Sequence, residues 1–214
     1  MKILAASDLH SEEEALETLE IIEKENNPDL TLILGDSAVD SVDYAERMLD
    51  ITKPEKTLTI NGNNENPELQ EYFRKKGVSI DNEVRRIQEF TFIGFGSSPR
   101  GPFHTVNEKS ESEIYNGLEK LFQKAKGGKT ILVTHTPPFG VFDEERGMHI
   151  GSTSIKEIIE KYQPLLNFCG HVHKKEGVEM IGNTKVVKVA SLMFKKAVLF
   201  DTQTIRPNFI TARA

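Results

Sequence analysis

The chain of 214 residues contains no tryptophan and only one cysteine, and it has no long apolar run. A single cysteine, Cys169, cannot form an internal disulfide, which favours a reducing, cytoplasmic location. No apolar segment approaches the ~18 residues that a membrane-spanning helix needs. The apolar start, Met1–Ala6, is shorter than the roughly 7–15 apolar residues of a signal peptide. We therefore expect a soluble protein without a membrane partner.

Basic side chains are not in excess either, because 27 Lys and Arg face 33 Asp and Glu, for a net charge of -6. Proteins that hold long nucleic acid by its phosphates need a basic surface, so we expect none to bind here. A small anionic substrate stays compatible if bound metal supplies the positive charge. Ordinary charged, glycine and proline contents exclude disordered, collagen-like and coiled-coil chains. The length suits one domain, residues 1–214, at roughly 150 residues per domain.

Short apolar runs alternate with amphipathic stretches, as buried strands alternate with helices. Six such runs precede residue 177: Lys2–Ala6, Leu30–Leu34, Thr57–Ile60, Phe90–Phe95, Thr130–Thr134 and Leu166–Cys169. Three more follow with short breaks and predict antiparallel strands: Val178–Ile181, Thr184–Ala190 and Ala197–Asp201. Gly182-Asn183 is a two-residue hairpin turn between the first two of these. The alternation predicts a layered α/β domain with mixed sheets.

Three segments carry a capping box, in which a serine precedes a glutamate by three residues at a helix start. These pairs are Ser11/Glu14, Ser110/Glu113 and Ser154/Glu157. Shorter helices are expected near Tyr44–Leu49 and Pro67–Lys75. Two long loops, 96–109 and 137–151, are candidates for functional segments, because long loops in compact domains often are.

Metal-binding residue types follow five of the predicted strands directly. They are Asp8 and His10, Asp36, Asn63, His135, and His171 with His173. Ligands of open α/β sheets bind outside the carboxyl ends of strands, so we expect these side chains to meet. Taken singly, most of these motifs are more typical of an ordinary turn or solvated loop than of a site. Their joint occurrence at successive strand ends favours a site.

Carboxylate, amide and imidazole donors without a thiolate suit Mn²⁺, Fe, Zn²⁺ or Co better than Ca²⁺. If the chain is extended there, Asp8 and His10 point the same way and can share one metal. His171 and His173 either share an ion or divide between two neighbouring ions. Seven ligands exceed the needs of one ion. Two ions about 3.5–4 Å apart with a bridging aspartate would use them all, a recurrent arrangement in phosphoester hydrolysis.

The ordered motifs resemble those of the calcineurin-like metallophosphoesterase family. They are Asp8-Leu9-His10, Gly35-Asp36, Gly62-Asn63, His135 and Gly170-His171-Val172-His173, spread over most of the chain. The resemblance implies a four-layer α-β-β-α sandwich with two mixed sheets. It also implies two divalent ions, Mn²⁺ first, with Fe, Zn²⁺, Co²⁺ and Ni²⁺ also compatible.

The resemblance further assigns a role to each ligand. Asp8, His10 and His173 would hold the first ion, and Asn63, His135 and His171 the second. Asp36 would bridge them, and a water or hydroxide between the ions would attack phosphorus in line.

One position departs from the family pattern, in which the residue after Gly-Asn is a histidine that contacts the phosphate or protonates the leaving oxygen. Here it is Asn64, which can hydrogen-bond a phosphoryl oxygen but cannot donate a catalytic proton. His104 and His149, in the two long loops, are candidate replacements or else ordinary surface histidines. Arg100 and Arg146 in the same loops are candidate phosphate clamps or solvated charges.

These residues predict a metal-dependent phosphoesterase that hydrolyses a small phosphodiester or an activated phosphomonoester. The alternative is a non-catalytic protein of the same fold, such as the retromer subunit, which serves mainly as a binding platform. All seven ligand positions hold residues that can bind metal, and this favours catalysis. The sequence leaves the oligomeric state open.

Overall fold

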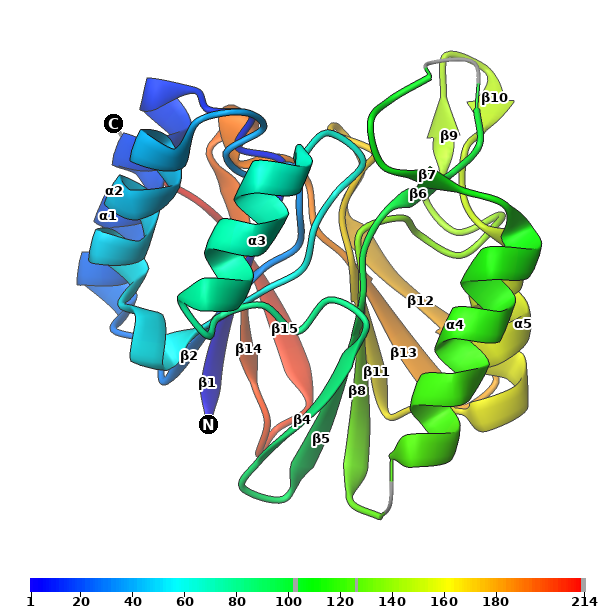
Figure 1. Cartoon of the computed structure of the whole chain (residues 1–214). Helices are drawn as coiled ribbons and strands as arrows, with labels where there is room; N and C mark the ends of the chain where they lie inside the picture. The colour runs from blue at the N-terminus through cyan, green and yellow to red at the C-terminus, as the bar shows by residue number, and fades with distance from the viewer. Residues whose placement is uncertain (102–103, 126, 213–214) are drawn as a thin grey trace.

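Two β-sheets lie face to face at the centre of the computed structural model, and helices cover their outer faces (Figure 1). This arrangement confirms the predicted four-layer α-β-β-α sandwich with two mixed sheets. The structure describes residues 1–101, 104–125 and 127–212. Among them, no helix combines the length and apolar character needed to cross a membrane.

The first sheet has the strand order β15-β14-β1-β2-β3. Its strands are β1 (Lys2–Ala6), β2 (Leu30–Ile33), β3 (Thr57–Thr59), β14 (Lys196–Asp201) and β15 (Arg206–Thr211). β1, β2 and β3 run parallel, so they end at one edge, whereas β14 pairs antiparallel with β1. The outer face is covered by α1 (Glu13–Asn26), α2 (Val42–Thr52) and α3 (Pro67–Lys75) (Figure 1).

The second sheet has the order β12-β13-β11-β8-β5-β4. Its strands are β4 (Glu83–Ile87), β5 (Phe90–Phe95), β8 (Lys129–Thr134), β11 (Leu166–Cys169), β12 (Gly177–Ile181) and β13 (Thr184–Lys188). Its outer face is covered by α4 (Glu111–Lys124) and α5 (Thr153–Tyr162) (Figure 1). The central strands β5, β8, β11 and β13 are mutually parallel.

Shorter elements complete the chain. Two 3-10 helices span Pro54–Lys56 and Leu192–Phe194. The two long loops carry the short strands β6 (Ser98–Pro99), β7 (Glu108–Lys109), β9 (Glu144–Glu145) and β10 (Met148–His149). These strands lie above the second sheet, beyond the ends of its central strands (Figure 1).

Apolar side chains fill each of the three interfaces between the four layers. Phe92, Phe168 and Phe200 are buried between the two sheets. A second cluster, including Phe73, packs the first sheet against its helices, and a third, including Leu118, does so for the second sheet. Because each buried large apolar side chain contributes about 1.5–3 kcal/mol, these layers hold the strand ends in fixed positions.

One of the three predicted capping boxes is confirmed. The Ser110 side chain accepts a hydrogen bond from the Glu113 N–H, and the Glu113 carboxylate accepts one from the Ser110 N–H. The box at Ser11 is wrong, because Glu12 is the N-cap residue of α1. The Ser11 hydroxyl instead donates to the carbonyl of Ala38, at 2.6 Å. A partner distant in sequence has replaced the local cap.

The box at Ser154 is wrong as well, by two residues. α5 is capped by Ser152, whose side chain accepts from the Ile155 N–H at 3.1 Å. The Ser154 hydroxyl, inside the first turn, donates to the backbone carbonyl of Glu111, at 2.7 Å. The contact between the starts of α4 and α5 therefore decides which serine caps the helix.

The predicted hairpin at Gly182-Asn183 is confirmed, since β12 and β13 pair antiparallel with Ile181 opposite Thr184. The tail is nevertheless not a simple antiparallel run, because β13 also pairs parallel with β11 and β14 crosses to the first sheet. Two edge strands, β4 and β15, were not predicted. Charged and polar residues interrupt their apolar pattern, as is common at sheet edges.

Candidate metal centre

Five strands deliver their C-terminal residues to one edge of the sandwich, at the top of Figure 1. The structure brings together there all seven side chains that the sequence singled out: Asp8, His10, Asp36, Asn63, His135, His171 and His173. The segment after β1 is not extended, however. Asp8 and His10 have φ angles of 56° and 53°, so a left-handed turn rather than strand alternation brings them together. Such backbone conformations concentrate at functional sites.

Two glycines allow the ends of β2 and β3 to approach each other. A Cβ atom on Gly35 would lie 2.4 Å from the backbone nitrogen of Gly62. A Cβ atom on Gly62 would lie 2.1 Å from Oδ1 of Asp36. A side chain at position 62 would therefore displace Asp36, and one at position 35 would force the turn after β3 away from the turn after β2.

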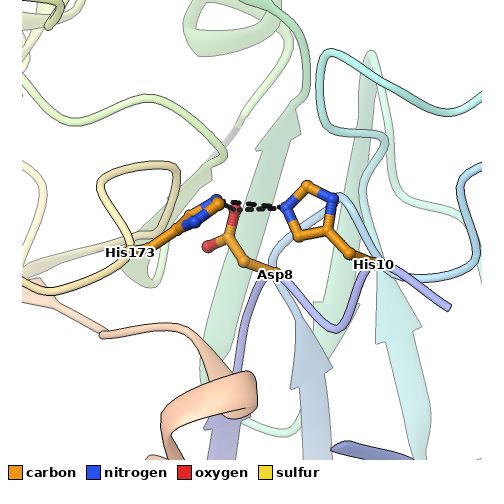
Figure 2. A group of neighbouring side chains, drawn as sticks. All are labelled: Asp8, His10 and His173. Atoms are coloured by element: carbon orange, nitrogen blue, oxygen red, sulfur yellow. Dashed lines mark hydrogen bonds and ion pairs between the residues drawn. The ribbon is translucent and has the colours of Figure 1, made fainter. Parts of the chain in front are cut away.

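Asp8, His10 and His173 form the outer cluster of the site. The Nε2 atoms of His10 and His173 lie 3.1 Å apart (Figure 2). Asp8 Oδ1 lies 3.9 Å from His10 Nε2 and 3.6 Å from His173 Nε2. All three donor atoms fall within 4.8 Å of one another. One divalent cation can be bound by such a set.

The hydrogen bonding of the Asp8 carboxylate indicates whether a cation fits between Asp8, His10 and His173. Its Oδ2 accepts hydrogen bonds from the Ser7 hydroxyl at 2.5 Å and from the His171 N–H at 3.0 Å. Oδ1 is buried and has no hydrogen-bond partner among the described residues. An unpaired buried carboxylate oxygen is costly, and a cation between Asp8, His10 and His173 would satisfy it.

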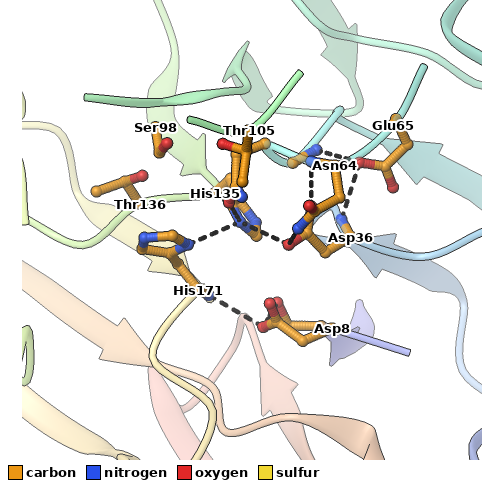
Figure 3. Close-up of polar contacts among 12 residues, drawn as sticks. Asp8, Asp36, Asn64, Glu65, Ser98, Thr105, His135, Thr136 and His171 are labelled. Carbon is orange, nitrogen blue, oxygen red and sulfur yellow. Dashed lines mark hydrogen bonds and ion pairs between the residues drawn. The ribbon is translucent and has the colours of Figure 1, made fainter. Parts of the chain in front are cut away.

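Asp36, Asn63, His135 and His171 form the inner cluster. His135 Nε2 lies 3.0 Å from Asn63 Oδ1, 3.1 Å from His171 Nδ1 and 3.5 Å from Asp36 Oδ2 (Figure 3). On the other side of the ring, His135 Nδ1 lies 2.8 Å from the carbonyl oxygen of Leu34 and donates to it. This hydrogen bond holds a proton on Nδ1, so Nε2 is the nitrogen that would bind a metal.

Asp36 faces both clusters. Its Oδ2 lies 3.7 Å from His10 Nε2 and 3.5 Å from His135 Nε2, which is the placement of a shared ligand. Asn64 donates to the same carboxylate twice, from its backbone N–H to Oδ1 at 2.9 Å and from its side-chain amide to Oδ2 at 2.6 Å. Asn64 thus orients Asp36 as well as lining the cavity above it.

The charges of the inner cluster also favour a cation there. Burial lowers the pKa of His171 to about 3, assisted by the neighbouring His135 ring, so His171 is a neutral imidazole. Burial opposes the charged form of Asp36, but His135 and His10 outweigh it and hold the carboxyl pKa well below its usual range. Burial also opposes the charged form of His135, yet Asp36 raises the pKa of that ring to about 9. The carboxylate attracts positive charge to the position that a cation would take.

Glu65, which follows Asn64, was not predicted as part of the site. It is fully buried and accepts hydrogen bonds from the backbone N–H groups of Asp36 at 3.1 Å, Ser37 at 2.6 Å and Gly62 at 2.7 Å. Burial, with the charge of Asp36, raises the pKa of Glu65 to about 7. Glu65 ties the turn after β2 to the turn after β3.

Lys188 is a second residue that sequence reasoning missed. Its fully buried ammonium donates to the carbonyl oxygens of Val172 at 2.8 Å, Lys175 at 3.2 Å and Val189 at 2.6 Å. Val172 lies between His171 and His173, so Lys188 holds the loop that carries a ligand of each cluster. A lysine within a valine-rich strand was the signal in the sequence.

The two loop histidines occupy different environments. His149 Nδ1 lies 2.7 Å from Oδ1 of the buried Asp143, which raises the pKa of His149 through this hydrogen bond and through its charge. Both rings are exposed, but His104, unlike His149, lies outside the set of residues that line the cavities near the metal centre. Of the two loop histidines, only His149 has a hydrogen bond to a carboxylate of the described residues.

A cavity of about 320 Å³ opens over the two clusters. His10, Asp36 and His173 line its floor, and Arg146 in the turn between β9 and β10 lines its side. Arg100 lines a neighbouring cavity instead, with its guanidinium 3.5 Å from the Glu113 carboxylate. The cavity can admit a small molecule to both clusters at once.

Two adjacent clusters of carboxylate, amide and imidazole donors at the edge of such a sandwich are typical of metal-dependent phosphoesterases. The family model of the calcineurin-like phosphoesterases matches residues 1–175. The chain belongs to that family.

Its relatives include proteins of similar length. An uncharacterized protein of Methanocaldococcus jannaschii, MJ1162, is 31% identical over 212 residues, which cover 95% of this chain and 93% of the relative. The crystal structure of TT1561 of Thermus thermophilus superposes with a TM-score of 0.76 at 18% identity, covering 99% of each chain. A dimetal phosphatase from Danio rerio superposes with a TM-score of 0.60 at 11% identity, covering 100% of this chain and 99% of the other. These two structures share the fold.

Proposed function

We propose that this protein hydrolyses a small phosphoester, either a phosphodiester or an activated phosphomonoester, with two divalent cations bound, Mn²⁺ first among them. The observation that carries the proposal is Oδ1 of Asp8, which is buried near the Nε2 atoms of His10 and His173 and has no hydrogen-bond partner in the part of the chain that the structure describes. A purely structural cluster would satisfy that oxygen with a hydrogen bond. A binding platform that has lost its metals would not retain seven donors in one place.

The residues divide between two ions. Asp8, His10 and His173 would hold one ion, Asn63, His135 and His171 the other, and Asp36 both. When bound, such a pair lowers the pKa of water and neutralises the charge of a phosphoryl group. Arg146, on the wall of the same cavity, is positioned to bind phosphoryl oxygens with its guanidinium.

His149 is proposed as the proton donor that Asn64 cannot be. The Asn64 amide has no acidic proton, and it is already hydrogen-bonded to Asp36. His149 donates from Nδ1 to Asp143, and the raised pKa keeps the ring protonated closer to neutral pH. As water attacks phosphorus and the bond to the leaving oxygen breaks, Nε2 of His149 would pass its proton to that oxygen. His104, exposed and outside the cavities, is assigned no role.

The first test measures metal content and turnover together. Purified protein should retain or take up about two transition-metal ions per chain. With Mn²⁺ present, a panel of phosphomonoesters, cyclic nucleotides, linear diesters and pyrophosphates should reveal a hydrolysed class. No retained metal and no activation by Mn²⁺ would contradict the proposal. Two bound ions without turnover of any class would favour the binding-platform alternative.

The second test separates the two loop histidines. His149→Ala should slow alkyl-ester hydrolysis by about 10²–10⁴-fold, because an alkoxide needs a proton to leave. Nitrophenyl esters, whose leaving groups are acidic, should respond far less. His104→Ala is the matched control and should leave both substrates unaffected. An equal response of both substrates to His149→Ala would remove His149 from the mechanism.

A further inference from the structure

A second cavity, of about 470 Å³, adjoins the cavity over the metal centre. The two share Asn63, Thr105, Ile150 and His171 as lining residues, so they lie directly beside each other. The second cavity lies between the loops that follow β5 and β8. Figure 3 shows Ser98 and Thr105 beside the inner cluster, with Ser98 on the side away from Glu65. A molecule whose phosphoryl group reaches the metals therefore has room to extend toward these loops.

An aromatic ring is presented to this space. Phe139 is 38% exposed although it lines the cavity. Its ring centroid lies 5.1 Å from that of His149 at an interplanar angle of 47°. Pro99 and Ile150 add apolar surface to the wall. Half-exposed aromatic surface in a cavity with a few polar groups is suited to a planar, apolar partner.

Besides His149, the charged side chains that line the cavity are two carboxylates, Glu108 and Glu111, and Arg100, whose guanidinium is paired with Glu113. α4 and α5 both begin here, and helix N-termini ordinarily attract anions. Here the chain's own glutamates occupy them. The Glu111 carboxylate accepts from the N–H groups of Thr153 and Ser154, each at 3.0 Å. The Glu113 carboxylate accepts from the Ser110 N–H at 2.8 Å. A further phosphate would be repelled by the Glu108 and Glu111 carboxylates in the wall, whereas a neutral group would not.

We propose that the second cavity binds the leaving group of the substrate, and that this group is a neutral, planar aromatic ring stacked against Phe139. The proposal rests on the proposed phosphoesterase function, since it places the phosphoryl group on the metal centre. His149, in the same wall, would then stand beside the departing oxygen. The substrate class is an aryl or heteroaryl ester of phosphate, as opposed to a pyrophosphate.

The test uses two phosphonates that cannot be hydrolysed and that differ only in planarity. Benzylphosphonate carries a flat ring, and cyclohexylmethylphosphonate carries a puckered ring of similar size. Binding of each to Mn²⁺-loaded protein is measured by calorimetry. We expect the wild-type protein to prefer benzylphosphonate. Phe139→Leu, which keeps apolar volume but removes the ring, should weaken benzylphosphonate about three- to tenfold and the saturated analogue little.

Two further variants control for folding and for loss of a ring elsewhere. Phe139→Tyr keeps the ring and should retain the preference. Phe209→Leu, on β15 of the other sheet, should change neither affinity. Equal binding of the two phosphonates, or equal losses in Phe139→Leu, would overturn the aromatic subsite while leaving the phosphoesterase proposal intact. Failure to bind Mn²⁺ at all would overturn both proposals.

Discussion

The outer and inner clusters of the metal centre differ in how firmly the protein holds their ligands. In the inner cluster, His135 is fully buried and anchored through Nδ1 to Leu34. In the outer cluster, the side chains of His10 and His173 are 22% and 37% exposed. Among the described residues, no hydrogen bond anchors the Nδ1 atom of either outer ring. The inner cluster is therefore preorganised, and we expect it to bind its ion more tightly.

The difference follows from where each cluster lies in the fold. The inner ligands follow β2, β3, β8 and β11, and the turns after these strands are tied together by buried groups such as Glu65. The outer ligands His10 and His173 lie further from their strands, each two residues beyond the first ligand of its loop, Asp8 or His171. A ligand supported by a second layer of hydrogen bonds loses less freedom when it binds metal. Substitutions in either cluster, or in the residues that support it, test this contrast.

The largest effect is expected for Asp36→Ala, which removes the carboxylate facing both clusters. Both ions should be lost, and with them all phosphoesterase activity, because neither cluster keeps its shared ligand. Metal analysis after desalting measures this, with the exposed Asp40→Ala as the control. Retention of a full ion in Asp36→Ala would show that one cluster needs no bridge.

A comparison of His135→Ala with His173→Ala tests the contrast directly. After exhaustive dialysis, His173→Ala should keep about one ion, in the inner cluster. His135→Ala should keep less metal. Its free energy of unfolding should also fall by about 1–3 kcal/mol, because the buried Leu34 carbonyl loses its hydrogen-bond partner. Metal content and chemical denaturation report the two effects. More metal in His135→Ala than in His173→Ala would reverse the assignment of the tighter cluster.

Lys188→Met should weaken both clusters together. The Lys188 ammonium holds the loop that carries His171 and His173, so its loss should cost about 10–100-fold in metal affinity at each. Titration with Mn²⁺ resolves the two binding steps. A loss confined to one cluster would show that the loop is held by other contacts.

The same variant gives a pH-dependent difference in stability. Burial lowers the pKa of Lys188 to about 8, whereas an unfolded lysine titrates near ~10.4. Between these values the unfolded chain binds the proton better, so this group raises the free energy of unfolding as pH increases from about 8 to about 10.4. Methionine removes that contribution. Denaturation at both ends of this range should therefore show the wild type gaining stability relative to Lys188→Met.

The smallest effect is expected for Asn64→His, which restores the histidine of the family pattern. Because His149 is proposed to supply the proton already, the gain in alkyl-ester turnover should be no more than about tenfold, and smaller still for nitrophenyl esters. Steady-state kinetics with both ester types, beside Asn64→Ala, measures it. A gain of about 10²-fold or more for alkyl esters would show that His149 is not an effective acid.

Local patterns predicted some elements well and others poorly. The buried strands were predictable because their sequences are short and mostly apolar, as in Lys2–Ala6. The cap at Ser110 was predictable because its partner lies three residues away. Ser11 and Ser154 carry the same pattern, but their hydroxyls bond to Ala38 and Glu111. Sequence spacing cannot reveal partners that only folding brings near.

The residue types alone determined which donor atoms this protein presents, because a histidine or aspartate carries its ligand chemistry wherever it lies. Their positions at the ends of apolar strands also determined that they would gather at one edge, since parallel strands end together. Only the tertiary structure decided that His135 is anchored and His173 exposed, that His149 rather than His104 is held by a carboxylate, and that Glu65 and Lys188 support the ligands. Burial and hydrogen-bond partners set those properties, and both come from segments far apart in the chain.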